Sequence, residues 1–258
     1  MWNTVTEAPT IVVTGAAGGI GRAICLEYAS TGGRVIGLDV DPAAVNELGS
    51  AAEGIVLDVT DAAAVDRVFG EIGPIDVLIH CAGITSLGPF RGTPMEAIDR
   101  VLDINLRGAI AVTGAALPGL IQTRGRIGVL SSVAGFSPLL YRTAYSASKH
   151  GLHGFFESLR VELADSGVSV TMICPSFVDT GIESRAAHHA PGEEGSWTTT
   201  GKVTSVEGLA GAVRKGLSKR KRLVLPSATA GSAYLVSRFS PQLFDRIMSR
   251  RIKGGREK

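Results

Sequence analysis

Tyr145 and Lys149 stand four residues apart in a segment of small and polar residues. In a helix this spacing puts the phenol and the ammonium on one face, about one turn apart. A phenol ordinarily loses its proton near pH 10, and a fixed positive charge alongside favours the phenolate. The pair could therefore move a proton to and from a substrate oxygen. Taken alone, such a spacing more often marks an exposed surface pair.

A hydroxyl group is available to work with this pair. Ser132 lies 13 residues before Tyr145 and follows an apolar run, 127–130, that has the character of a strand. A hydroxyl at the carboxyl end of a strand could hold a substrate oxygen beside the tyrosine. These three side chains need a scaffold that brings a strand end and a helix together.

The N-terminal region indicates such a scaffold. An apolar run at 11–13 leads directly into the glycine-rich segment 14–21, and then into a stretch where Ile20, Ile24 and Tyr28 recur with helical spacing. Glycines let the backbone approach a pyrophosphate closely, and the first turn of the helix offers free N–H groups and partial positive charge. The pattern predicts a strand, a dinucleotide-binding turn and a helix.

A carboxylate at the end of the next predicted strand bears on the cofactor. Segment 34–39 ends in Asp39, 18 residues beyond Gly21. A carboxylate there can accept hydrogen bonds from the ribose hydroxyls of the adenosine, and it repels a 2′-phosphate. Val40 follows, and Gly18 occupies a turn position that could otherwise carry a cation. The sequence therefore predicts NAD in preference to NADP.

Apolar runs and helical stretches alternate along the chain, which predicts an α/β fold with a doubly wound parallel sheet. Thr93 and Thr204 each precede a glutamate by three residues and are expected to cap helices. We expect one domain over 1–226 and a helical extension over 227–258. The seven predicted strands lie at 11–13, 34–39, 55–57, 77–79, 127–130, 168–173 and 223–225.

From about residue 10 to about residue 225 the sequence resembles the short-chain dehydrogenase/reductase family. The resemblance implies a Rossmann fold with a seven-stranded sheet, an oxidoreductase activity on CH–OH groups, and a nicotinamide cofactor. The matching residues are Thr14, Gly15, Gly19, Gly21, Asp58, Val59, Cys81, Ala82, Gly83, Asn105, Ser132, Tyr145, Lys149, Pro175 and Thr180.

The resemblance also implies a role for each site residue. Tyr145 would be the general acid/base, Lys149 would lower the pKa of the tyrosine and bind the nicotinamide ribose, and Ser132 would orient the substrate oxygen. Asn105 would help to hold a water molecule in a proton relay. The implied dinucleotide contacts are Gly15, Ala17, Gly18, Gly19, Ile20, Gly21, Asp39, Asp58, Val59, Cys81, Ala82, Gly83, Tyr145, Lys149, Pro175, Val178 and Thr180.

Two segments depart from the family pattern. His80 and Cys81 stand where the family usually has two asparagines, so the amides that brace the central sheet are missing. We interpret His80 as a hydrogen-bonded structural group and not as a catalytic one. Ser176 follows Pro175 where a glycine is usual, which leaves the local backbone beside the nicotinamide undetermined.

The residues around the predicted catalytic group suggest the class of substrate. Segment 136–141 is mostly apolar, and such rims usually receive apolar ligands. Segment 181–203 is expected to form a lid over the substrate, in which Trp197 either closes on the ligand or packs under the loop. His188 and His189 have no third ligand at a suitable spacing, so no metal is expected.

Composition indicates which kinds of partner and which cell compartment to expect. The net charge is +2, and no cluster of basic and aromatic residues indicates a nucleic-acid surface. Cys25, Cys81 and Cys174 are expected to be buried thiols in a reducing compartment. Segment 1–9 carries no secretion signal, and no run of 18 uninterrupted apolar residues is present, so we expect a cytoplasmic protein.

The C-terminal segment 227–258 has apolar residues at helical spacing interleaved with arginines and lysine. A basic amphipathic helix can lie on an anionic membrane surface. Packing against the subunit core or a neighbouring subunit is favoured over this possibility. The resemblance suggests a homotetramer or dimer built partly on helices at 94–123 and 144–166. Alternative functions are a non-catalytic dinucleotide sensor or scaffold, a membrane-associated lipid, steroid or retinoid dehydrogenase, and epimerisation or dehydration on the same scaffold.

Overall fold

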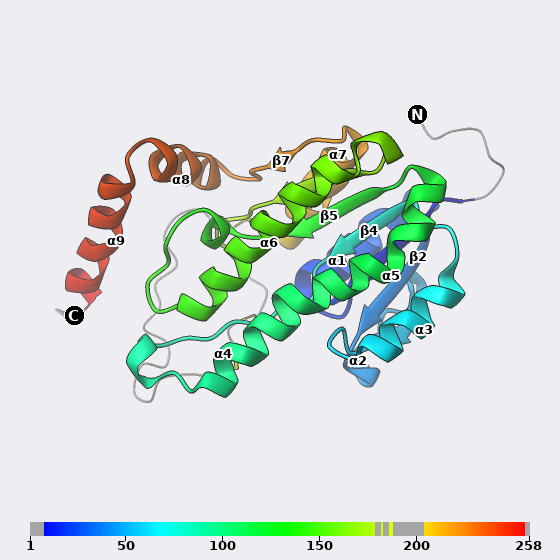
Figure 1. Ribbon diagram of the computed structural model, residues 1–258, viewed down its shortest axis with the longest axis horizontal. Helices are drawn as coiled ribbons and strands as arrows, with labels where there is room; N and C mark the ends of the chain where they lie inside the picture. Colours follow the sequence, from blue (N-terminus) through cyan, green and yellow to red (C-terminus); the bar gives the residue numbers. More distant parts are fainter. Residues whose placement is uncertain (1–7, 179–181, 183–185, 188–203, 256–258) are drawn as a thin grey trace.

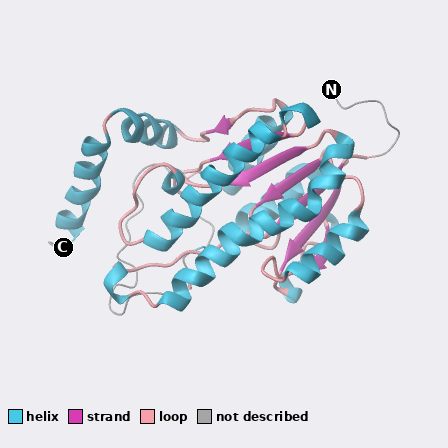
Figure 2. Ribbon diagram, in the orientation of Figure 1, coloured by secondary structure: helices cyan, strands magenta, loops and turns pink. Residues whose placement is uncertain are grey.

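A seven-stranded parallel sheet forms the centre of the protein, whose computed structural model describes residues 8–178, 182, 186–187 and 204–255. Its strand order is β3-β2-β1-β4-β5-β6-β7, and every pair of neighbours is parallel (Figure 2). The seven predicted strands are all present. They are β1 (Thr10–Thr14), β2 (Arg34–Asp39), β3 (Glu53–Val56), β4 (Val77–His80), β5 (Arg126–Leu130), β6 (Ser169–Ile173) and β7 (Leu223–Val224).

Helices cover both faces of the sheet, as a doubly wound fold requires (Figure 1). Helices α3, α5 and α6 contribute to the core on one face, and α1 and α7 to the core on the other. The helices are α1 (Gly19–Ala29), α2 (Pro42–Asn46), α3 (Ala62–Ile72), α4 (Met95–Leu102), α5 (Gly108–Thr123), α6 (Thr143–Glu162), α7 (Val206–Ser218), α8 (Ala228–Phe239) and α9 (Pro241–Gly255). Short 3-10 helices occur at η1 (Gly49–Ala51), η2 (Phe90–Gly92), η4 (Val133–Gly135) and η5 (Ala164–Ser166), and a π-helical turn at η3 (Asp103–Arg107).

The apolar runs of the central strands serve both cores at once. Val12 and Leu78 point into the core on one side, and their neighbours Val13 and Ile79 into the core on the other. Alternate side chains of a strand face opposite sides of a sheet, so a strand covered on both faces must be apolar throughout. This is why these strands could be recognised as continuous apolar segments.

The chain order creates a crevice at one edge of the sheet. From β1 the chain builds outward through β2 and β3, and then returns to place β4 on the other side of β1. Ligands of such sheets bind at the carboxyl ends of the strands, at the point where the order reverses. The loops after β1, β4, β5 and β6 therefore lie where a shared site can form.

Both predicted helix caps are displaced by one residue or lost. Helix α4 begins at Met95 after Pro94, whose extended backbone takes the capping position, and Thr93 instead donates a hydrogen bond to the carbonyl of Pro89 (3.0 Å). Helix α7 is capped by Ser205, whose Oγ accepts from the backbone N–H of Gly208 (3.1 Å). The predicted starts were nearly correct, but the capping threonines were wrong.

Helices α4 and α5, joined by η3, form a continuous run from Met95 to Thr123 that is long and apolar enough by composition to cross a membrane. Val112, Ala116 and Leu120 of this run are buried in the sheet core. A core helix of a folded domain passes the same test, and the burial of these side chains identifies the run as such a helix.

Helices α8 and α9, residues 228–255, form a bent arm that leads away from the sheet (Figure 1). We call it the C-terminal arm. Helix α8 lies against η4, and α9 lies against α8. Phe244 is buried, but Phe239 and Leu243 are exposed. Packing against the subunit core, the first of the two favoured alternatives, therefore does not hold for Phe239 and Leu243.

Candidate functional site

A cleft of about 860 Å³ opens at the carboxyl edge of the sheet, between β1 and β4. Its volume is in the range of ligand-binding clefts. Acidic side chains from α4 and η3, Glu96, Asp99 and Asp103, line it as well, and sequence reasoning missed them because their spacing carries no motif. The predicted dinucleotide contacts that line the cleft are Gly15, Ala17, Gly18, Gly19, Ile20, Gly21, Asp39, Asp58, Val59, Cys81, Ala82 and Gly83.

Glycines let the turn after β1 pack closely on the loop after β4. Gly15 has a φ of +66°, and a Cβ at this position would lie 2.6 Å from the Cα of Ala82. The N–H of Gly18 donates to the carbonyl of Gly15 (3.2 Å), and α1 begins directly afterwards at Gly19. The first-turn N–H groups of α1 have no partner within the helix, so they can bind an anionic pyrophosphate at the cleft wall.

Two carboxylates are held in place at the other end of the turn. Asp39 accepts hydrogen bonds from the N–H groups of Ala17 (3.0 Å) and Asp41 (3.3 Å). Asp58 accepts from the N–H and the hydroxyl of Thr60 (2.9 and 2.7 Å). Both carboxylates line the cleft and retain free acceptor positions. The glycine turn, the helix start and these acceptors together fit a nicotinamide dinucleotide.

The predicted catalytic residues come together beside this cleft. Ser132 follows the end of β5, while Tyr145 and Lys149 lie one turn apart on α6, and all three side chains are buried. The side chain of Ser132 lies close enough to the Tyr145 phenol to lower its pKa. The Nζ of Lys149 lies 5.6 Å from the centre of the Tyr145 ring.

Lys149 reaches from α6 to the inner wall of the cleft. Its Nζ donates a hydrogen bond to the carbonyl of Leu130 (2.7 Å). A Cβ built at Gly83, which lines the cleft, would lie 3.8 Å from this Nζ. Ser132, Tyr145 and Lys149 are not among the residues that line the cleft, but the ammonium of Lys149 lies close to Gly83, which does line it. Burial lowers the pKa of Lys149 to about 8.

Burial raises the pKa of the Tyr145 phenol above its ordinary value, because the charged phenolate is disfavoured away from water. The guanidinium of Arg142 and the side chain of Ser132 both lower this pKa. Lys149, which the resemblance implied for that role, is instead bonded to the backbone of Leu130. Arg142 was not singled out in the sequence, although it precedes Tyr145 by only three residues and stands immediately before the first residue of α6.

Asn105 ties the loop after β4 to α6. It is buried in the π-helical turn η3, where its Oδ1 accepts from the N–H of Ile84 (2.8 Å). Its Nδ2 donates to the carbonyl of Ile84 (2.9 Å) and to Oγ of Ser148 (3.0 Å), which in turn donates to the carbonyl of Tyr145 (2.8 Å). Ser148 is a positioning residue that sequence reasoning missed. Its place next to Lys149, on the helix that carries the tyrosine, was the available signal.

His80 has a structural role in this arrangement. Its Nε2 lies 2.8 Å from Oγ1 of Thr113, whose hydroxyl donates to the carbonyl of Ala109 (2.7 Å). A hydroxyl has one hydrogen to donate, so the network assigns the ring proton of His80 to Nε2. Burial lowers the pKa of His80 to about 3, with a further contribution from the charge of Lys149. The ring is therefore neutral at physiological pH.

Replacing His80 with glutamine should reduce the acid sensitivity of the fold. The unfolded histidine takes up a proton below about pH 6.5, whereas the folded one does not until about pH 3. Its share of the stability is therefore present above pH 6.5 and is lost as the pH falls from 6.5 towards 3. Between about pH 7.5 and about pH 5 the wild type should lose about 2 kcal/mol of unfolding free energy more than His80→Gln. Urea unfolding of both proteins at the two pH values measures this difference, and equal losses would contradict the assignment.

The remaining predicted contacts lie around the loop after β6. Pro175 is buried, and its carbonyl accepts from the N–H of Val133 (3.1 Å), next to Ser132. Ser176 forms a hydroxyl–hydroxyl hydrogen bond with Ser227 at the start of α8 (2.8 Å). Val178 is half-buried and pairs with the segment at 204. The other residues named from the sequence, Thr180, His188, His189, Trp197 and most of segment 181–203, lie outside the described residues.

The three cysteines differ in their surroundings. Cys25 and Cys174 are buried, as expected, and burial raises the pKa of each thiol to about 12. Cys81 is only half-buried and lines the cleft, so the expectation of a buried thiol is wrong at this position. It follows β4 directly, and the loop there must open towards the ligand.

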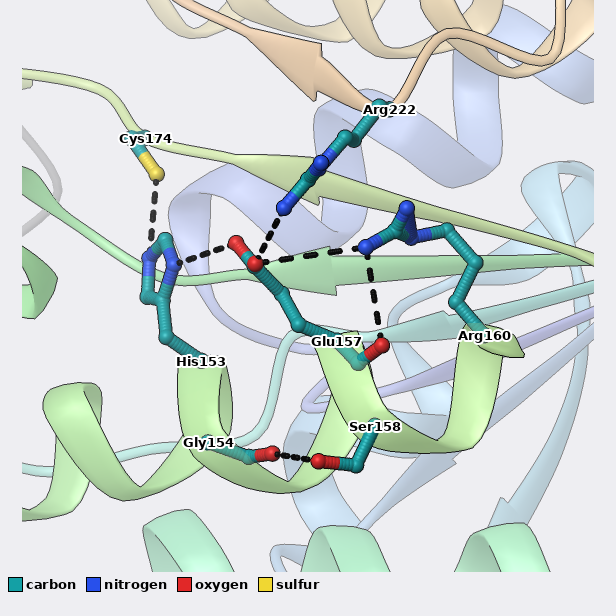
Figure 3. A network of polar contacts seen from close by, with 7 residues as sticks. All are labelled: His153, Gly154, Glu157, Ser158, Arg160, Cys174 and Arg222. Atoms are coloured by element: carbon teal, nitrogen blue, oxygen red, sulfur yellow. Dashed lines mark hydrogen bonds and ion pairs between the residues drawn. The ribbon is translucent and has the colours of Figure 1, made fainter. Parts of the chain in front are cut away.

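Cys174 belongs to a chain of polar contacts behind the site (Figure 3). Its thiol lies 3.5 Å from Nε2 of His153, whose Nδ1 lies 3.4 Å from Glu157, and Glu157 pairs with Arg222 at 2.5 Å. The order cysteine, histidine and glutamate resembles a nucleophile with its base. A thiol pKa of about 12 leaves almost no thiolate at neutral pH, however, so the chain of contacts braces α6 against the strands and does not activate the sulfur.

Comparisons with known proteins identify the family of the chain. Residues 9–190 match the family model of the short chain dehydrogenases. The chain is 36% identical to "Probable oxidoreductase EphD" of Mycobacterium tuberculosis over 255 residues, which covers 90% of the chain and 43% of that protein. The chain thus spans less than half the length of that relative. It is 30% identical to "Dehydrogenase/reductase SDR family member 7B" of Rattus norvegicus over 270 residues, or 96% of the chain and 82% of the relative.

Solved structures show the same architecture. A short-chain dehydrogenase from Streptomyces avermitilis superposes with a TM-score of 0.82 at 27% identity, covering 96% of this chain and 99% of its own. A short chain dehydrogenase from Burkholderia cenocepacia, in complex with NADP, gives a TM-score of 0.82 at 22% identity, with 94% and 98% covered. On the family match and the parallel sheet, the chain belongs to the short-chain dehydrogenase/reductase family.

Proposed function

We propose that this protein is an NAD-dependent oxidoreductase that interconverts a secondary alcohol and a ketone on a small lipophilic substrate. The observation that carries the proposal is the burial of Ser132, Tyr145 and Lys149 beside one another, with Tyr145 and Lys149 one turn apart on α6. The ammonium of Lys149 lies close to the cleft at Gly83. Proton transfer and dinucleotide binding can thus occur side by side.

The protein's own groups account for the proton in this reaction. The bound nicotinamide would accept a hydride from the substrate carbon in oxidation and return it in reduction. Tyr145 takes the hydroxyl proton in oxidation and gives one back in reduction. Ser132 accepts from the N–H of Ala134 (3.1 Å), so its own hydrogen is available for the substrate oxygen or for Tyr145. Because these side chains are buried, water is kept from competing for the same hydrogen bonds.

Several features around the tyrosine support a lipophilic substrate. Phe136 and Leu139 are half-buried and Leu140 is exposed, so apolar side chains are available at the rim. Tyr141 has a φ of +59°, in the left-handed region that favours glycine, and its carbonyl accepts from the N–H of Gly88 (3.0 Å). A strained backbone is often found where a loop shapes a ligand site. Segment 85–88 and segment 136–141 are thus held together.

The preference for NAD rests on the carboxylates of the cleft. Asp39 is fixed by the N–H of Ala17, and Asp41 and Asp58 line the same cleft. A 2′-phosphate placed near Asp39 would meet negative charge and no compensating side chain in Val40. Removing Asp39 should weaken NADH binding by about 10- to 100-fold, the range for a hydrogen bond to a charged group, and should affect NADPH much less.

Fluorescence titration of Asp39→Ser with NADH and NADPH measures this change without a known substrate. Asp66→Ser is the matched control, because Asp66 is exposed on α3 and does not line the cleft. Tighter binding of NADPH than of NADH by the wild type would overturn the cofactor preference.

Turnover of a substrate panel tests the proposed reaction. Hydroxysteroids, hydroxyacyl compounds and aliphatic or cyclic alcohols would be offered with NAD, and the absorbance of the reduced cofactor followed. We expect turnover of at least one lipophilic secondary alcohol. Tight NAD binding without turnover of any class would instead support a non-catalytic sensor.

We also propose that the protein is a cytoplasmic homo-oligomer, a tetramer or a dimer, that uses α4, α5 and α6. Large apolar side chains are exposed on these helices, namely Met95, Ile121 and Val161. Exposed apolar residues on neighbouring helices are typical of subunit interfaces. Light scattering coupled to size-exclusion chromatography gives the mass directly, and a monomer at all concentrations would contradict this assembly.

A further inference from the structure

The C-terminal arm differs in charge from the rest of the chain. Segment 227–258 contains seven arginines and lysines and two acidic residues, a net charge of +5. Since the whole chain carries +2, the other 226 residues are net negative, at −3. The excess of positive over negative charge in this protein therefore comes from segment 227–258.

The same arm exposes large apolar side chains at regular intervals. Leu235 and Phe239 of α8 are 56% and 81% exposed, and Leu243 and Ile247 of α9 are 47% and 39% exposed. Phe239 is the most exposed large apolar side chain in the described part of the chain. Residues four apart lie on one face of a helix, so each helix presents a pair of apolar side chains to solvent.

Arginines accompany both pairs. Arg238 precedes Phe239, Arg246 precedes Ile247, and both are exposed. Ala230 is buried on the side of α8 opposite Phe239, and Phe244 of α9 is buried beside the exposed pair of that helix. The apolar pairs are therefore not required to hold α8 and α9 together.

We propose that the C-terminal arm binds an anionic lipid surface, with its exposed apolar side chains inserted among the acyl chains and its arginines at the lipid phosphates. Amphipathic helices with basic residues beside an apolar face bind in this way, through apolar burial and attraction to anionic lipids. A lipid bilayer offers both kinds of contact along its whole surface. An anionic lipid surface therefore matches both the positive charge and the exposed apolar side chains of the C-terminal arm.

A second copy of the chain fits this face less well. In a symmetric contact made through the arms alone, each arm would meet the arm of its partner, and two C-terminal segments of +5 (residues 227–258) would be brought together. Such like charges oppose association unless anions lie between them. The apolar side chains also occur as separated pairs next to arginines, whereas the core of an obligate interface is depleted in charge.

The base of the arm connects it to the candidate active site. Tyr234 of α8 packs edge-on against Phe136 (5.1 Å between ring centres), and Ser227 bonds Ser176 beside Pro175. If the proposed function is correct, binding of the arm brings the apolar rim close to the bilayer, where a lipophilic substrate is dissolved. This consequence rests on the proposed function, whereas the binding of lipid itself does not.

Sedimentation of the full chain with vesicles tests the inference. Vesicles of phosphatidylcholine alone would be compared with vesicles that also contain phosphatidylglycerol, at low and high salt. We expect pelleting with the anionic vesicles and release by salt. The double variants Phe239→Gln/Ile247→Gln and Arg238→Glu/Arg246→Glu should each bind the anionic vesicles at least about 10-fold more weakly, since each removes contacts on both helices.

Single substitutions of the same two kinds, placed elsewhere on the surface, serve as controls. Leu26→Gln removes an exposed apolar side chain of α1, and Arg67→Glu reverses an exposed charge of α3. Both should pellet like the wild type. Circular dichroism and NADH binding of every variant verify that the fold is retained, and turnover in solution reports on the proposed function separately.

Three results would overturn the inference. The full chain would fail to pellet with anionic vesicles at low salt, or the arm variants would pellet as well as the wild type. Alternatively, the arm variants would keep their vesicle binding while analytical ultracentrifugation showed that their oligomer had dissociated, which would identify the arm as an interface between copies.

Discussion

Replacing Tyr145 with phenylalanine should lower kcat/KM by about 10²- to 10⁴-fold, the range that a positioned acid or base contributes. Phenylalanine fills the same buried space but has no proton to exchange with the substrate oxygen. The dinucleotide contacts of the glycine turn lie on other elements, so NADH binding should be close to that of the wild type. Steady-state kinetics on an alcohol from the substrate panel, together with NADH titration, measure both quantities.

A control variant and an unfolding measurement distinguish a loss of chemistry from a loss of folding. Tyr141→Phe removes a neighbouring phenol at the rim and should leave most of the rate intact, since Tyr141 lies on the loop before α6, outside the helix that carries Tyr145 and Lys149. Tyr145→Phe should also retain the thermal unfolding profile of a folded protein. A Tyr145→Phe enzyme with wild-type kcat/KM would remove Tyr145 from the mechanism.

Replacing Lys149 with methionine is the second change with a large expected effect. The ammonium borders the cleft and lies 5.6 Å from the ring of Tyr145, so its loss removes a positive charge near both the phenol and the dinucleotide. We expect kcat/KM to fall by about 10²-fold or more. Weaker NADH binding should accompany the lower rate, which distinguishes this variant from Tyr145→Phe.

The pH dependence of the reduction rate tests whether the charge of Lys149 is responsible for this effect. Burial lowers the pKa of Lys149 to about 8, so the group is charged below about pH 8 and neutral above it. In ketone reduction Tyr145 must be protonated, and its raised pKa keeps it so across this range. The wild-type rate of reduction should therefore be full below pH 8 and fall as the pH rises through that value. Lys149→Met should lack this fall, and an unchanged fall in the variant would assign it to another group.

The fold could be predicted because its signals are local. Each strand of the sheet is an apolar run between turn residues. Because the strands are buried on both faces, polar residues do not alternate with the apolar ones, and the runs are easy to recognise. The glycine turn and Asp39 were recognisable for a similar reason, since a close backbone approach and a strand-end carboxylate depend on neighbours in the sequence. The structure places both on one cleft.

Other features depend on contacts that the sequence does not display. Asn105 reaches Ser148 across 43 residues, and Arg142 acts on Tyr145 through the local shape of a loop and a helix start. The predicted cap at Thr204 failed by one residue, because Ser205 competes for the same N–H groups. Such choices are made by small energy differences that spacing cannot resolve.

Burial accounts for the main chemical difference. For groups in water, a nearby cation lowers the pKa of a tyrosine, and the spacing of Tyr145 and Lys149 predicted this effect. In the folded protein both groups are desolvated, so the pKa of Tyr145 rises and that of Lys149 falls. The charge near the phenol therefore depends on what fills the cleft, and a cationic nicotinamide would favour the phenolate.

An ultraviolet difference titration of tyrosine in the NAD complex tests this account most directly. The titration of Tyr145→Phe is subtracted from that of the wild type, with and without NAD, so that only the phenolate of Tyr145 remains. We predict a single phenolate whose pKa is lower with NAD bound than without it. A difference spectrum that does not change when NAD is added would contradict the placement of Tyr145 beside the bound cofactor.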